Sequence, residues 1–341
     1  MPKRVSISEI MHLTGLSRAT IDRALNGRGG IHPRTEQVIR EALATLSDSA
    51  RTDNPNVRQH PVSVDFVLRL GRGLASQLME IGKQLGQPTN IIDMHQKNDD
   101  EIYEAVSATC KDIDKPLVLT AKRNERLHGL LVDARKRGKR VITLVSDLPH
   151  EARDAFVGID NRMAGQTAAY LIGNLLRERS EAVVGVVLGD YAFTCHEDRE
   201  IGFRSHLRTH FPNIRLAEVV KGEDSPSQTF EAVSNLLKEN PGIAAIYNVA
   251  GGNQGLAQAL RERNRVGNIC VITHEANKIT VPLLRDDILQ YLLAQNPGDL
   301  LSEATALAVS QTISKEQYLL DFALYTRFNL PRFGVEAARQ P

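Results

Sequence analysis

Residues 6–26 read SISEIMHLTGLSRATIDRALN and predict two short helices joined by a tight turn. Ser6 can cap the first helix, because its hydroxyl can accept a backbone amide at the helix start, and an acidic residue follows three positions later as in a capping box. Gly15 interrupts the apolar spacing with a residue that is free to adopt a positive φ. Ser17 then caps the second helix. We expect this stretch to form part of a compact all-α unit.

A third helix is expected after Pro33, and it completes an N-terminal domain over residues 1–46. Residues 1–40 carry seven basic and three acidic side chains, whereas the formal net charge of the whole chain is only +1. A basic end on a nearly neutral body indicates contact with a polyanion. Apolar residues at helical spacing would form the buried side of this third helix: Val38, Ile39, Ala42, Leu43 and Leu46.

Two helices joined by a glycine-containing turn are typical of a helix-turn-helix, in which the second helix lies against DNA. Arg18 can bond guanine with both ends of its guanidinium, and Ala19 can contact a thymine methyl group. The hydroxyls of Ser17 and Thr20 can donate to phosphate, and Arg23 lies on the outer side of the same helix. The alternative is a helical hairpin that serves only for packing. The agreement of turn, caps and charge favours DNA binding.

The run GLSRATIDRALN, residues 15–26, resembles the signature of the lactose-repressor (LacI/GalR) family of transcription regulators. The resemblance implies that Arg18 and Ala19 select operator bases, and that Arg23 contacts a base or the backbone. It also implies backbone contacts from Ser17, Thr20 and Asn26. The full set expected at the DNA is Ser6, Ser17, Arg18, Ala19, Thr20, Arg23, Asn26 and Arg34.

Two features depart from the family pattern. Asp22 stands where many members carry Ser, and an acid near phosphate is unfavourable unless a neighbouring arginine neutralises it. Residues 47–61, SDSARTDNPNVRQHP, are polar with two prolines and predict a linker. In the family this segment forms a hinge helix whose leucine wedges into the minor groove. No leucine lies between Ser47 and Pro61, so the resemblance weakens at this point.

From residue 62 the pattern changes to alternating strands and helices, which predicts an α/β region with parallel sheets and helices on both faces. The region extends to residue 330, followed by a tail at 331–341, and its length suits one very wide sheet or two lobes. Strands are expected at 62–68, 116–120, 140–145, 182–188, 243–247 and 269–273. Helices are expected at 74–86, 124–137, 162–178, 197–210, 226–239, 252–263 and 298–312.

This region resembles the periplasmic-binding-protein-like sensor of the same family. The resemblance implies two α/β lobes joined by three crossovers, near 158–162, 291–297 and 320–326, with ligand in the cleft between the lobes. In such sheets ligands bind beyond the carboxyl ends of the strands. The expected ligand contacts are therefore the polar residues that follow each strand.

Five such residues suit a polyhydroxylated ligand, because carboxylates accept from hydroxyls, arginine donates, and amides do both. They are Asp147, Arg199, Asn248, Glu275 and Gln295, and the resemblance places all five where the family holds sugar. Helix caps, surface acids and a solvated arginine pair are the alternatives. Candidates of second rank are Arg72, Tyr191, Phe193 and His196, with lobe packing as their alternative.

No enzyme pattern is found. The glycines Gly251 and Gly252 lack the complete dinucleotide fingerprint and are expected to relieve crowding beside the cleft, and neither a nucleophile elbow nor a P-loop occurs. We expect no catalytic residue, no metal and no cofactor. Three scattered cysteines indicate a reducing compartment, and the absence of a signal peptide or membrane span indicates a cytoplasmic protein.

These observations predict a transcription regulator, most simply a repressor, that responds to a sugar or polyol. It is expected to act as a homodimer on a pseudo-palindromic operator in double-stranded DNA, because one half-site offers too few base contacts. The alternatives are a sugar-binding protein without a DNA function and a carbohydrate-processing enzyme on a similar fold.

Overall fold

The computed structural model describes residues 62–83 and 89–331, together with helix α2 (Arg18–Leu25) and seven single positions between residues 10 and 42. The chain divides into two compact units, residues 1–60 and 61–341. Each unit is described by itself.

In the first unit, α2 coincides with the helix expected after Ser17. Ile10, Ile21, Ile39 and Ala42 are buried together in one small cluster. These four residues come from all three of the helical stretches that the apolar spacing predicts. Thr20 is half-buried and Arg23 is exposed. Ser6, Ser17, Asn26, Arg34 and the linker lie outside the described residues, as do the side chains of Arg18 and Ala19.

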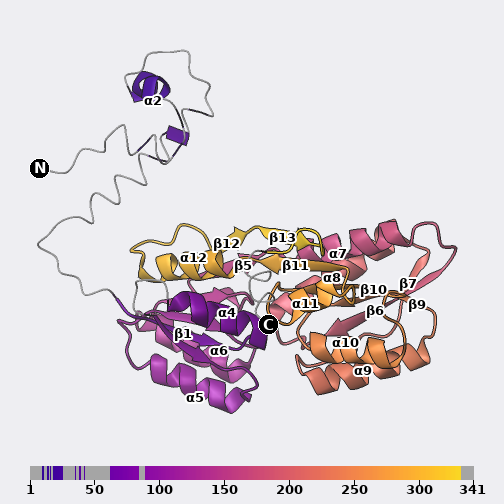
Figure 1. Ribbon diagram of the computed structural model, residues 1–341. Coiled ribbons are helices and arrows are strands. Elements are labelled where there is room, and N and C mark those ends of the chain that lie inside the picture. Colours follow the sequence, from indigo (N-terminus) through magenta and orange to yellow (C-terminus); the bar gives the residue numbers. More distant parts are fainter. Residues whose placement is uncertain are drawn as a thin grey trace, which may run out of the picture. The chain divides into compact units, whose positions relative to one another are not determined.

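The second unit contains two sheets, one in each of two lobes (Figure 1). The sheet of lobe 1 has six strands in the order β12-β5-β4-β3-β1-β2, and every neighbouring pair is parallel. The strands are β1 (Val64–Leu68), β2 (Thr89–Asp93), β3 (Leu117–Thr120), β4 (Val141–Leu144), β5 (Ala155–Ile159) and β12 (Gln317–Leu320).

The sheet of lobe 2 has the order β13-β11-β10-β9-β6-β7, and β8 also pairs with β6. Only β13 is antiparallel, to β11, and it lies at the edge of the sheet. The strands are β6 (Ala182–Leu188), β7 (Ile214–Leu216), β8 (Val220–Lys221), β9 (Ile243–Asn248), β10 (Cys270–His274), β11 (Tyr291–Gln295) and β13 (Phe322–Tyr325).

Helices cover both faces of the lobe 1 sheet, as a buried parallel sheet requires. α4 and α12 share one core cluster with β1, β3, β4 and β5, and α5 and α6 form a second cluster on the opposite face. Their bounds are α4 (Arg72–Gly82), α5 (Asp99–Thr109), α6 (Glu125–Lys136) and α12 (Pro297–Val309), with a 3₁₀ turn η1 at His150–Ala152.

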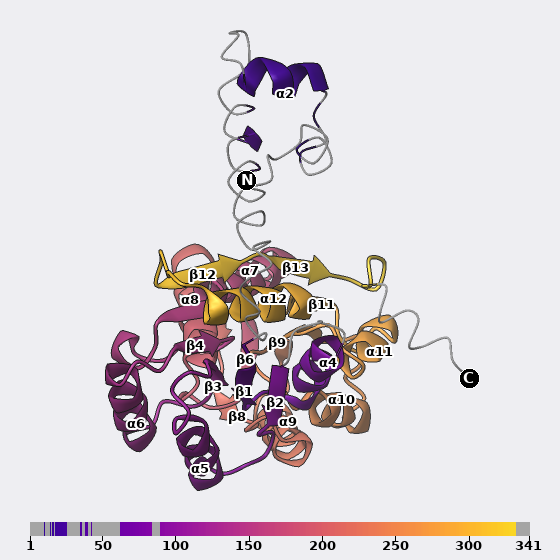
Figure 2. The same cartoon turned by 90° about the vertical axis from the view of Figure 1, so that its left-hand side faces the viewer.

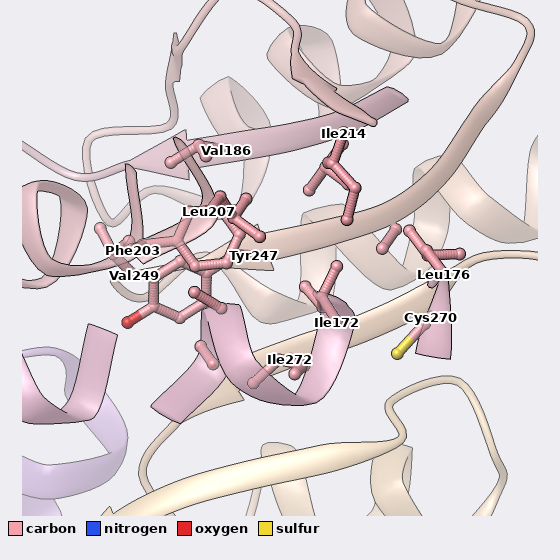
Figure 3. Close-up of a cluster of buried hydrophobic side chains, with 14 of the residues drawn as sticks. Ile172, Leu176, Val186, Phe203, Leu207, Ile214, Tyr247, Val249, Cys270 and Ile272 are labelled. Carbon is pink, nitrogen blue, oxygen red and sulfur yellow. The ribbon is translucent and has the colours of Figure 1, made fainter. Parts of the chain in front are cut away.

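Lobe 2 repeats this layering. One cluster joins α7 and α8 to the sheet, where Phe203 and Tyr247 stack with ring centroids 4.6 Å apart (Figure 3). The other cluster joins α9, α10 and α11 to the opposite face. The bounds are α7 (Asn161–Leu175), α8 (Thr194–His210), α9 (Pro226–Glu239), α10 (Asn253–Glu262) and α11 (Thr280–Arg285).

The chain passes between the lobes three times, and all three predicted crossovers are confirmed. It leaves lobe 1 between β5 and α7, returns between β11 and α12, and crosses again between β12 and β13. Figure 2 shows β12 and β13 following one another in line. The expected two-lobed α/β fold with parallel sheets is therefore observed.

Candidate ligand-binding site

A pocket lies between the two lobes, beyond the carboxyl ends of strands from both sheets. Its volume is about 1050 Å³, including the part that is open to solvent. Lobe 1 lines it with Arg69, Leu70, Gly71, Arg72, Gly73, Leu74, His95, Gln96, Thr120, Val145 and Ser146. The polar lining from lobe 2 is Cys195, His196, Arg199, Asp224, Asn253, Gln254, His274, Glu275, Asn277 and Thr280.

Arg199 is buried on α8, with only 3% of its surface exposed. Its Nε donates to Asn161 Oδ1 at 2.8 Å, and Nη1 donates to the Val249 carbonyl at 2.9 Å. These two bonds fix the plane of the guanidinium. The remaining nitrogen, Nη2, has no hydrogen-bond partner and lies 3.9 Å from a carboxylate oxygen of Glu275. A fixed, buried and unpaired donor at a pocket wall is suited to hold a ligand oxygen.

Glu275 follows β10 and is held by Gln295, whose Nε2 donates to Glu275 Oε1 at 2.7 Å. Burial raises the pKa of the Glu275 carboxyl, although Arg199 and Gln295 act in the opposite direction. Gln295 does not itself line the pocket, and its Oε1 is buried without a partner. The predicted pair of Glu275 and Gln295 is therefore assembled, with Glu275 facing the pocket and Gln295 positioning it.

His274 is the last residue of β10 and is 2% exposed. Its Nε2 lies 2.7 Å from the Tyr247 hydroxyl, which has no other acceptor among the described residues. We therefore assign the hydroxyl as donor to Nε2, so the hydrogen of the neutral ring sits on Nδ1. Nδ1 is buried without a partner, and His274 lines the pocket. Burial, Arg199 and His196 hold the pKa of His274 well below its usual value, which keeps the ring neutral.

Backbone strain marks the same edge of each sheet. Val145 follows β4 with φ 66°, and Glu275 follows β10 with φ 65°. A branched side chain rarely adopts positive φ, and such conformations persist where the surrounding structure requires them. At Val145 the Ser146 amide donates to the Leu144 carbonyl at 2.7 Å, which closes a tight turn. Both strained residues line the pocket.

The start of α8 also contributes to the wall. Phe193 and His196 stack with ring centroids 5.2 Å apart, and both line the pocket. Arg72, the first residue of α4, lines it from lobe 1. Tyr191 is not part of the lining, and its ring lies 5.8 Å from the ammonium of Lys221.

Two of the five principal candidates lie elsewhere. The Asp147 carboxylate forms two hydrogen bonds with Arg153, of 2.6 and 2.8 Å, and accepts another from Thr143. Asn248 is fully buried, where its amide donates to the Gly251 carbonyl and to Asn253 Oδ1. Neither residue lines the pocket, and both side chains bind neighbouring loop residues. Their contact with a ligand stays a prediction.

Several residues that line the pocket were not among the ligand contacts predicted from the sequence. His274 ends a strand and was detectable by the rule that the carboxyl ends of strands face the ligand. Asn253, Asn277 and Asp224 carry no comparable signal, because their place depends on loop conformation. Gly252 has φ 73°, and a Cβ there would lie 1.9 Å from Thr229 Oγ1, which supports the packing role expected for this glycine.

Within the described part of the chain, no group of three metal-ligating side chains comes together. All three cysteines are buried and free. None of the described helices is both long and apolar enough to cross a bilayer.

Comparison with protein families gives one match, to the model described as a periplasmic binding protein domain, over residues 115–316. The chain belongs to this family. The matched residues include most of both lobes and both strand ends at which φ is positive.

Solved structures share the fold of the second unit at low sequence identity. A glucose-galactose binding protein from Geobacillus stearothermophilus superposes with a TM-score of 0.72 at 18% identity, over 80% of this chain and all of its own. A solute binding protein from Burkholderia graminis, in complex with D-arabinose, gives 0.71 at 18% identity, over 79% of this chain and 96% of its own. A fructose binding periplasmic domain of a hybrid two component system gives 0.72 at 16% identity, over 81% and 94%. A comparison with curated proteins finds no match.

Proposed function

We propose that the pocket between the lobes binds a sugar or a related polyol. The observation that carries the proposal is the unpaired Nη2 of Arg199, held at the pocket wall beside Glu275. Guanidinium donors and carboxylate acceptors side by side match the paired donor and acceptor character of sugar hydroxyls. His274 adds a further donor through Nδ1.

Three of the second-rank candidates extend this site. We propose that Arg72, Phe193 and His196 contact the ligand together with Arg199 and Glu275, and that Gln295 acts through Glu275. The structural neighbours support the ligand class, since they include a glucose-galactose binding protein, a solute binding protein in complex with D-arabinose and a fructose binding domain. Ligand binding is the activity that we propose for this site.

Thermal unfolding in the presence of single sugars tests this proposal. At least one neutral or derivatised sugar should raise the unfolding midpoint of the wild-type chain, because a ligand that binds only the native state stabilises it. In Arg199→Lys the charge remains, but the fork that contacts Asn161, Val249 and the ligand is lost. We expect the shift to disappear or fall sharply in this variant.

Arg261 on α10 provides the matched control, because it is exposed and does not line the pocket. Arg261→Lys should respond to the ligand as the wild type does. If no sugar stabilises the wild type, the sugar-binding proposal is wrong. An undiminished shift in Arg199→Lys would exclude Arg199 from the binding role.

We further propose that residues 1–46 bind duplex DNA and that the chain is a ligand-responsive transcription regulator. Support comes from the helix-turn-helix signature, the surplus of basic residues, helix α2 and the buried cluster of Ile10, Ile21, Ile39 and Ala42. The proposed DNA contacts are Ser6, Ser17, Arg18, Ala19, Thr20, Arg23, Asn26 and Arg34.

In this proposal a cytoplasmic homodimer reads two half-sites, and residues 47–61 connect reader and sensor. The ligand binds two arrangements of the lobes with different affinities. This difference sets how far the ligand can change the affinity for DNA. Selection of fragments from random duplex DNA by the full chain tests the reading role. Enrichment of a two-fold symmetric sequence is expected, and no enrichment would leave sugar binding as the sole function.

A further inference from the structure

The long helices of the second unit differ in how their amino ends are capped. The first residues of α5, α6, α7 and α12 are not part of the pocket lining, and a side chain of Asn98, Asn124, Asp160 or Asn296 caps each of these helices. α4, α8, α9 and α10 start at the pocket, and in none of them does the N-cap residue provide a side-chain cap, although Ser146 Oγ accepts the Cys195 amide of α8. Uncapped amino ends present free N–H groups and a partial positive charge.

The carboxylates that line the pocket belong to one lobe only. The lining from lobe 1 contains Arg69 and Arg72 but no Asp or Glu. Both lining carboxylates, Asp224 and Glu275, come from lobe 2 and already have donors. Asp224 Oδ1 accepts the Gly251 amide at 2.6 Å, and Glu275 accepts from Gln295.

The two arginines of lobe 1 differ in their partners. Arg69 forms an ion pair with Asp99. Arg72 is exposed at the first helical position of α4, and its guanidinium has no partner within the described residues. The lobe 1 wall therefore combines an uncompensated positive charge with the uncapped amino end of the same helix.

Buried side chains in lobe 2 add to the surplus of donors. Arg199 Nη2 and His274 Nδ1 both lack hydrogen-bond partners, on residues that are 3% and 2% exposed. An unpaired donor at this depth is costly unless a ligand satisfies it. This observation is independent of the helix ends, and it indicates that the occupant of the same pocket is rich in acceptors.

We propose that the ligand carries an anionic group, a carboxylate or a phosphate, and that Arg72 and the amino end of α4 bind this group while lobe 2 holds the hydroxyl-bearing part. The inference rests on the proposed sugar-binding function and specifies its ligand class. Almost every hydrogen-bond acceptor of a neutral sugar is a hydroxyl that is also a donor, whereas an anionic group offers acceptors only. Charge-assisted bonds to arginine and to helix amides are the strong interactions available at this wall.

Calorimetric titration of the full chain with matched sets of ligands tests the proposal. Each set contains a neutral sugar, its uronic acid and its 6-phosphate, for example D-glucose, D-glucuronate and D-glucose 6-phosphate, with the corresponding galactose set. We expect an anionic member of one set to bind about tenfold more tightly than its neutral partner. Comparison of the acid and phosphate arms identifies which anion is the natural one.

Substitutions at the start of α4 locate the anion. Gly71 is the N-cap residue with φ −58°, and a Cβ there meets no atom within 4 Å, so a side chain fits. Gly71→Asp places a carboxylate on the free amides and should lower the anion-to-neutral affinity ratio about tenfold or more, without lowering the unfolding midpoint. Gly71→Asn caps the same amides without charge and should lower the ratio less.

Arg72→Gln should also reduce the anion-to-neutral ratio, whereas Arg261→Gln, on the exposed side of α10, should leave it unchanged. Equal or tighter binding of the neutral partners would overturn the anionic inference and leave the sugar-binding function intact. If the anion-to-neutral affinity ratio is unchanged in a folded Gly71→Asp variant, the start of α4 does not bind the anion. If no member of any set binds, the proposed function and this inference both fail.

Discussion

Arg199 uses two of its three guanidinium nitrogens for the fold and leaves the third for the pocket. The bonds to Asn161 and Val249 link the first turn of α7 with the loop after β9, so the same side chain that faces the ligand also joins two segments of lobe 2. A ligand that bonds to Nη2 provides the hydrogen-bond partner that this nitrogen lacks. This is the physical reason for expecting ligand binding to stabilise the native state.

At the residue scale, His274 should make stability dependent on pH. Its native pKa is held well below the usual 6.5 by burial, Arg199 and His196, so the unfolded chain takes up a proton below that pH and the native ring does not. Stability is therefore retained above pH 6.5 and lost as the pH falls below it. A single such group contributes a slope of at most about 1.4 kcal/mol per pH unit.

Chemical denaturation between about pH 5 and pH 7.5 measures this slope. His274→Gln keeps an acceptor for the Tyr247 hydroxyl but cannot titrate. The free energy of unfolding of the variant should fall less steeply below pH 6.5 than that of the wild type. Identical slopes in the two proteins would show that His274 does not resist protonation.

At the residue scale, five candidates predicted from the sequence line the pocket: Arg199, Glu275, Arg72, Phe193 and His196. Glu275 directly follows a strand, Arg72 and Phe193 lie at helix starts, and Arg199 lies in the second turn of α8. Their contact with a ligand stays a prediction. Asp147 and Asn248 lie after or at the end of strands, yet each is bound by polar groups three to six residues further along, which the loop conformation turns back onto it. Arg153 lies six residues beyond Asp147, and only the fold of the loop turns it back onto the carboxylate.

At the scale of elements, α7 and α8 approach closely because each helix carries a glycine where it crosses the other. A Cβ at Gly165 would lie 2.0 Å from the carbonyl oxygen of Arg199, and one at Gly202 would lie 2.2 Å from that of Arg162. The close crossing therefore sets the position of the helix segment that carries Arg199.

Gly165→Ala should destabilise the protein by about 1–3 kcal/mol, because the added methyl forces the helices apart. It should also weaken ligand binding, because the added methyl group displaces the backbone of Arg199. Gly129→Ala is the control on α6, where a Cβ meets nothing within 4 Å. This variant should gain about 0.4–1 kcal/mol and bind normally.

Denaturant unfolding and calorimetric titration of both alanine variants provide the measurement. If Gly165→Ala and the wild type have equal free energies of unfolding, α7 and α8 can move apart without loss of stability.

Element prediction was best for long segments with strong apolar patterning. The helix at 226–239 and the strand at 182–188 have their predicted bounds. The sequence did not predict the helices α5 and α11 or the strands β2, β5, β7, β8, β11, β12 and β13. β2 is only partly buried, with two exposed positions in TNIID, so its sequence lacks the continuous apolar run of a central strand. The three crossovers were found from family resemblance rather than from local pattern.

At the scale of the whole second unit, several polar contacts bridge the two lobes, including an ion pair between Lys122 and Asp190. Thr194 Oγ1 donates to the Asp147 carbonyl at 2.8 Å, and Gln77 Nε2 donates to the Ala276 carbonyl at 3.0 Å. Arg123 pairs with Glu197 at 2.8 Å, but both side chains are more than a third exposed or close to it, so this pair adds little. A ligand held by both lobes adds contacts to these bridges and can shift the balance between arrangements of the lobes.

The central claim is that one chain couples a ligand in this pocket to the affinity of its first 46 residues for DNA. Fluorescence anisotropy of the full chain on a selected duplex, with and without the best ligand of the titrations, tests it most directly. We predict that the ligand changes the affinity of the wild type about fivefold or more, and that Arg199→Lys abolishes the change while Arg18→Ala weakens preference for the selected sequence. No preference over random duplex in either state, or an affinity that the ligand leaves unchanged, would contradict the account.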